Sequence, residues 1–104
     1  MLLTSNYTPR DSQIVVGTAS TIVSNETTKQ RRTAFIITNI STAGQIITLS
    51  FGKEAVANTG IILSAGASWY EAIDAEFRPS NLMITAISSA AAGLLSIHER
   101  SEAI

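Results

Sequence analysis

Residues 31–52, RRTAFIITNISTAGQIITLSFG, contain two short apolar runs around a polar break, and this pattern constrains the fold more than any other feature. In each run the side chains divide between two faces at a period of two, which is the period of a β-strand. The pattern predicts strands over residues 33–40 and 45–51, the intervening STAG supplies turn residues, and Gly52 ends the second strand. We therefore expect these two strands to pair as a hairpin.

Short β-rich runs follow one another along the rest of the chain, and no stretch has the 3.6-residue periodicity of a packed helix. The segments 54–58 and 71–77 are long enough only for a helical turn. Turn residues separate the runs at intervals of about 8 to 12 residues, which is typical of a β-sandwich. The chain of 104 residues is thus predicted to be all-β, a single β-sandwich or jelly-roll-like domain of seven to eight short strands over residues 13–104, preceded by an extended N-terminal arm over residues 1–12.

The charge content gives no indication of a nucleic-acid or membrane partner. Only 14% of the residues are charged, and the formal net charge is −1. A chain without a strong charge bias or a long apolar segment is not expected to bind either one. The opening MLLTSNYTPRDSQ lacks a basic region followed by an apolar run, so we expect no secretion signal and synthesis in the cytoplasm.

Residues that could carry catalysis or hold a metal are few. His98 is the only histidine and there is no cysteine, so a zinc site or an activated nucleophile would lack partners. Glu71, Asp74 and Glu76 could offer carboxylates to calcium, but they lack the glycine and the acidic spacing of a calcium loop. A solvated sheet edge is the favoured interpretation. We predict no catalytic residue, no metal site and no cofactor, and hence no enzyme.

Two groups of residues are candidates for contacts with other proteins. Lys29, Arg31 and Arg32 form a basic run that could dock on an acidic surface, and the alternative is a solvated loop. The second group consists of apolar residues left over once one face of the strands fills the core, together with the only pair of adjacent aromatic residues. These candidate interface residues are Ala34, Ile36, Ile46, Trp69 and Tyr70. Apolar residues on both faces of a small domain predict a partner, and a second copy of the chain is the simplest one. For Trp69 and Tyr70, a position at the end of the core is the alternative.

A set of residues in a fixed order resembles small β-sandwich virion proteins of tailed phages: Arg32, Phe35, Ile37, Asn39 and Ser41, followed by ITLSFG at 47–52, Ala55, GIIL at 60–63 and Gly66. The resemblance covers residues 31–70 and points to head decoration or cement proteins. It implies a non-enzymatic structural role on a virion, with the major capsid protein as partner and a homo-oligomer, a trimer favoured. A glycan-binding module of a tail fibre or adhesin is the alternative. Exposure of Trp69 and Tyr70 in a shallow groove would favour glycan binding, and their burial between subunits would favour the structural role.

Overall fold

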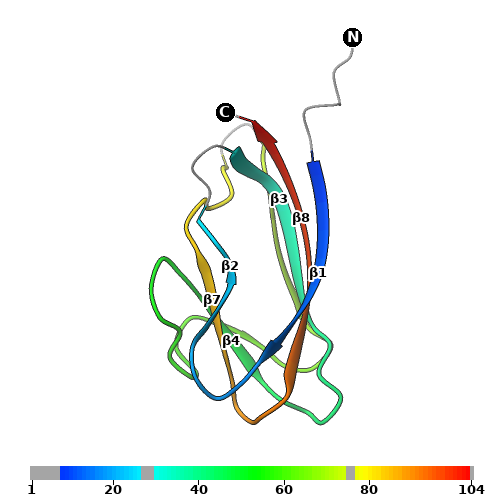
Figure 1. The fold of residues 1–104 in the computed structure, drawn as a ribbon, viewed down its shortest axis with the longest axis vertical. Helices are drawn as coiled ribbons and strands as arrows, with labels where there is room; N and C mark the ends of the chain where they lie inside the picture. The colour runs from blue at the N-terminus through cyan, green and yellow to red at the C-terminus, as the bar shows by residue number, and fades with distance from the viewer. Residues whose placement is uncertain (1–7, 27–29, 75–76, 104) are drawn as a thin grey trace.

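The computed structural model describes residues 8–26, 30–74 and 77–103, and it is an all-β sandwich of two antiparallel four-stranded sheets (Figure 1). The first sheet, sheet A, has the strand order β1-β8-β3-β6, and the second, sheet B, has the order β2-β7-β4-β5. The strands are β1 (Thr8–Val16), β2 (Thr21–Ser24), β3 (Gln30–Asn39), β4 (Ile47–Phe51), β5 (Ile61–Leu63), β6 (Ser68–Ala72), β7 (Ile84–Ser88) and β8 (Gly93–Ala103). The predicted fold class is confirmed.

The core lies between the two sheets and is built from alternate residues of the strands. In sheet A, Phe35, Ile37, Leu95 and Ile97 point inward and are at most 2% exposed. Sheet B contributes fully buried branched side chains from β4 and β7. The described residues form no helix, and thus none that could span a membrane.

The predicted hairpin is wrong. β3 pairs with β8 and β6 in sheet A, whereas β4 pairs with β7 and β5 in sheet B, so residues 40–46 cross from one sheet to the other. The buried Asn39 supports this crossing, because its side-chain nitrogen donates to the carbonyl oxygens of Gln45 and Leu63. Its oxygen accepts from the backbone of Ser41. Alternation predicts strands but says nothing about which strands pair.

The N-terminal boundary also differs from the expectation. β1 begins at Thr8 and pairs with β8 over its whole length, from Thr8 opposite Ser101 to Val16 opposite Gly93. Residues 8–12 therefore belong to sheet A, and the rest of the expected arm, residues 1–7, lies outside the described residues. Within 54–58 there is no helical turn, only a bridge between Val56 and Thr59. The other candidate turn is strand up to Ala72, and its residues 75–76 are outside the described part.

The loop after β4 folds back over the outer face of sheet B. Thr85 donates its hydroxyl to the backbone oxygen of Lys53 at 2.6 Å, and Thr48 accepts from the backbone of Asn58. Both threonines are only 2% exposed although their side chains leave the core. The loop is thus a cover for the middle of this sheet.

Candidate functional site

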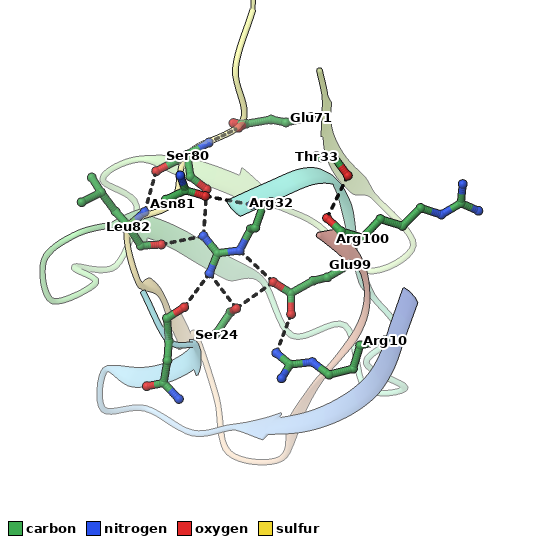
Figure 2. Close-up of polar contacts among 11 residues, drawn as sticks. Arg10, Ser24, Arg32, Thr33, Glu71, Ser80, Asn81, Leu82, Glu99 and Arg100 are labelled. Carbon is green, nitrogen blue, oxygen red and sulfur yellow. Dashed lines mark hydrogen bonds and ion pairs between the residues drawn. The ribbon is translucent and has the colours of Figure 1, made fainter. Parts of the chain in front are cut away.

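The basic run of the sequence does not form a single surface. Arg32 is 2% exposed and lies at one end of the sandwich, where its guanidinium group is surrounded by acceptors (Figure 2). Its Nε donates to Glu99 at 2.8 Å. Its four terminal N–H groups are matched by four oxygens: the backbone oxygens of Ser80, Leu82 and Asn25, and the hydroxyl of Ser24. All five donors of an arginine are therefore used inside the protein.

Glu99 is the acidic partner in this cluster. It is 6% exposed, and besides Arg32 it accepts hydrogen bonds from Arg10 and Ser24, each at 2.8 Å. Burial alone would raise the pKa of Glu99, but the hydrogen bonds from Arg32, Arg10 and Ser24 and the charge of Arg32 outweigh it, and the pKa is lowered from its ordinary value. The carboxylate is thus held ionised, and the network joins sheet A to β2 and to the segment that leads into β7.

This burial corrects the hypothesis that Arg32 contacts a capsid surface, because a side chain with no free donor and 2% exposure cannot reach a partner. Arg31 is exposed and forms an ion pair with Glu102. Lys29 lies outside the described residues. Arg31 is therefore the one residue of the run that the structure places at the surface.

The outer face of sheet A carries three of the five candidate interface residues. Ala34, Ile36 and Tyr70 share this face because directly opposed residues of antiparallel strands point the same way, and Ile36 is opposite Tyr70. Ile36 is 40% exposed and Tyr70 is 71% exposed. The structure thus brings these three together as an open, partly apolar surface.

Ile46 and Trp69 do not belong to this surface. Trp69 is opposite Ile37, a core residue, so it points to the inner side at the sheet edge, where it is 39% exposed and donates to Glu71 at 3.1 Å. Ile46 precedes β4 on the other sheet, and its backbone bonds to Ser89. The sequence pattern placed Ile36 and Ile46 on one face because it assumed the hairpin.

Two shallow hollows lie side by side on this face, along the seam between β3 and β6. The larger has a volume of about 210 Å³ and the smaller about 180 Å³, and both are lined by Ala34, Ala72 and Arg100. Tyr70, Ile36 and His98 border the larger one. Ala34 is directly opposite Ala72, and the neighbouring cross-strand pair is Ile36 and Tyr70. The hollow therefore lies over two small side chains, beside two large ones. We call these two hollows the trough.

Arg100 and His98 on β8, with Asp11 on β1, form a polar group on the same face, beside the trough. The Nδ1 of His98 lies 2.5 Å from the Asp11 carboxylate, and its Nε2 accepts from Nε of Arg100 at 3.2 Å. No hydrogen bond leads from Nη1 or Nη2 of Arg100 to another described residue. His98 therefore occupies a chain of hydrogen bonds on an open sheet surface, and no hydroxyl or thiol nucleophile takes part in that chain.

The carboxylates of the acidic cluster that the structure describes accept hydrogen bonds from neighbouring residues. Glu71 accepts from Trp69 and from the backbone of Ser80, and Asp74 accepts from the backbone of Phe77. Glu76 lies outside the described residues, and within the described ones no three histidine or carboxylate groups are placed to hold a metal.

Sequence reasoning missed Ala72, Arg100 and Asp11 as parts of the open face. They lie on three different strands and meet the others only through strand pairing. The available signal was the alternation in SIHER, which puts His98 and Arg100 on the same side of β8.

No model of a known protein family and no curated protein sequence matches the chain. Among solved structures the fold is similar to a chain of the Bacillus endospore appendages, described as a novel family of disulfide-linked pili. The match has a TM-score of 0.63 at 14% sequence identity and covers 94% of this chain and 87% of that one. A likeness at this level of identity shows a shared fold.

Proposed function

We propose that the protein is a non-enzymatic structural subunit that works in a multi-copy assembly. The observation that carries this proposal is the open outer face of sheet A, where Ile36 and Tyr70 stay exposed beside a trough floored by alanines. An exposed apolar surface with a polar border is typical of protein interaction sites. The described polar clusters serve the fold or lie on this surface.

The fold likeness to the endospore appendage chain supports a structural role, because that protein is described as forming pili. This chain has no cysteine, so its assembly would be held together without disulfides. The narrower proposal, a decoration or cement subunit bound to the major capsid protein of a virion, rests on the resemblance over residues 31–70. Of the two arginines of the basic run that the structure describes, Arg31 is the one available for such a contact.

Imaging and sizing together test the proposal. The purified chain at about 100 µM is examined by light scattering and by negative-stain electron microscopy, alone and with tailed-phage heads lacking their decoration protein. We expect self-associated species, ordered polymers or decorated heads. A chain that stays monomeric alone and leaves the heads bare contradicts the proposal.

Glycan binding is the second candidate, and the exposure of Tyr70 beside a shallow trough favours it. An aromatic ring can stack on the apolar face of a sugar, while Arg100 could bond to its oxygens. Screening on a glycan array, with Tyr70→Ala as the comparison, distinguishes this function. Specific binding lost in the variant would support it.

A further inference from the structure

Tyr70 is unusually exposed for an aromatic side chain. It projects from β6 on the outer face of sheet A and is 71% exposed, the highest value among the exposed large hydrophobic residues. Its cross-strand neighbour Ile36 supports one side of it, and no described residue covers its outer side. Tyrosine is enriched where one protein contacts another.

The trough lies directly beside this tyrosine on the same face. Its floor is the opposed pair Ala34 and Ala72, and its border includes Arg100, whose terminal nitrogens bond to no other described residue. Each hollow is smaller than the pockets of about 300 to 1,000 Å³ that hold small-molecule ligands. A hollow of this size, mostly apolar and with one cation at its border, suits a single aromatic side chain.

We propose that the outer face of sheet A binds the same face of a second copy across a two-fold axis, with each Tyr70 inserted in the trough of the other copy. A projection and a hollow that lie side by side on one surface are self-complementary, which is the requirement of a two-fold interface. The inserted ring would lie near the guanidinium of Arg100, which attracts aromatic rings and can donate to the phenol oxygen. This inference rests on the proposed function, since it specifies how the copies associate.

A second copy fits better than a sugar because a saccharide exposes many hydroxyl groups. The trough offers few polar partners, and alanine and isoleucine side chains form much of its lining. A two-fold pairing fits better than a head-to-tail one because the outer face of sheet B is covered in its middle by the loop after β4. The trimer implied by the phage resemblance would need two different contact patches, whereas this arrangement uses one.

Two variants with opposite defects test the arrangement. Tyr70→Ala removes the projection and leaves the trough, and Ala72→Leu fills the trough and leaves the projection. We expect either variant alone to weaken self-association about 30-fold or more, as expected for the loss of an aromatic anchor. Val56→Ala is the matched control, because Val56 is 59% exposed on the loop over sheet B and its truncation should leave association unchanged. Circular dichroism and thermal unfolding confirm that each variant is folded.

Mixing the two variants separates this proposal from other modes of association. In the mixed pair, the Tyr70 of the Ala72→Leu copy meets an intact trough, while the second contact has neither a projection nor an open hollow. Native mass spectrometry should therefore show the mixed dimer in excess of both variant homodimers. Wild-type self-association that is unaffected by either variant would overturn the two-fold pairing and leave the structural role intact. So would a mixed dimer at or below the statistical proportion. A wild-type chain that is monomeric at about 100 µM and does not bind phage heads would reject both the two-fold pairing and the structural role. Sugar binding that is lost in Tyr70→Ala would show that the trough binds a glycan instead.

Discussion

The outer faces of the two sheets differ in how much of their surface the protein itself covers. Both faces point away from the core, and the strands of both sheets have apolar side chains on them. On sheet B the protein covers the middle of the face with its own loop, and the hydroxyls of Thr48 and Thr85 bond to that loop's backbone. On sheet A the corresponding surface, with Ile36 and Tyr70, remains open.

This difference indicates which face is available to a partner. The covered middle of sheet B has its polar groups satisfied and is removed from solvent, so a partner would gain little by binding to that part of the face. An open face with an exposed aromatic residue and a hollow retains apolar surface that binding can bury. The comparison depends on the sheets staying packed, on the cover staying in place and on the open face being dispensable for folding, and each condition can be tested.

Removing Arg32 should have the largest effect, because its side chain ties sheet A to β2 and to the segment before β7. Arg32→Ala removes the buried cation from the Glu99 carboxylate and takes a donor from three backbone oxygens, and the expected loss is about 3 to 5 kcal/mol of unfolding free energy. Arg31→Ala is the control: Arg31 pairs with Glu102 at the surface and should cost about 0 to 1 kcal/mol. Urea denaturation followed by circular dichroism measures both. Equal losses would show that the buried network does not hold the sheets together.

Lifting the cover from sheet B should have the next largest effect. Gly60, at the end of the loop, has φ +128, and an added Cβ would lie 2.5 Å from the backbone oxygen of Leu49. Gly60→Ala therefore forces a backbone shift and should cost about 2 to 3 kcal/mol. Gly17→Ala is the control, because nothing lies within 4 Å of its added Cβ. Hydrogen exchange should be faster at the amide of Asn58 in Gly60→Ala, and protection there equal to that of the wild type would show that the loop tolerates the change.

Removing one threonine hydroxyl from each face should have a smaller effect on stability, and the loss should differ between the two faces. Thr85→Val removes the donor to the backbone oxygens of Lys53 and Ser50 inside the covered face and should cost about 1 to 3 kcal/mol. Thr38→Val removes a hydroxyl that bonds to Ser68 on the open face, where water can replace it, so the loss should be below about 0.5 kcal/mol. Thermal unfolding of the two variants gives the comparison directly. A larger loss for Thr38→Val would show that the open face is the better satisfied one.

The strands and the core could be predicted from the sequence because alternation is a local property. Phe35 and Ile37 on one face, and Ile47 and Leu49 on another, lie in the core as their period of two implies. Pairing is not local, so the hairpin was wrong and the meeting of Ala34 with Ala72 could not be foreseen. For the same reason, the sequence could not show that Ile36 and Ile46 lie on different sheets, or that Tyr70 and Arg100 line the same hollow.

Arg32 shows a different limit. Counting back in twos from Ile37 and Phe35 places Arg31 and Thr33 inside and Arg32 outside. The register of β3 against β8 shifts between Arg32 and Ala34, which is the signature of a bulge, and the shift turns Arg32 inward. One extra residue in a strand reverses the face of every side chain beyond it. No residue type in QRRTAF indicates that a bulge is present. The basic run was therefore interpreted as a surface feature, although its last member, Arg32, is buried.

Ile36→Lys should change stability less than Arg32→Ala, Gly60→Ala or Thr85→Val, and it tests whether the open face serves association alone. Ile36 is 40% exposed at the centre of that face, so a lysine can extend into water and the unfolding free energy should change by less than about 1 kcal/mol. In an association, however, the lysine would be placed against the apolar trough of the second copy, which is costly for a buried charge. Light scattering at matched concentrations should show loss of the associated species. Ile62→Lys is the control, since Ile62 is 51% exposed on the outer side of sheet B and should leave association unchanged. If Ile62→Lys dissociates the protein and Ile36→Lys does not, the copies meet through the covered sheet, and the comparison between the faces is reversed.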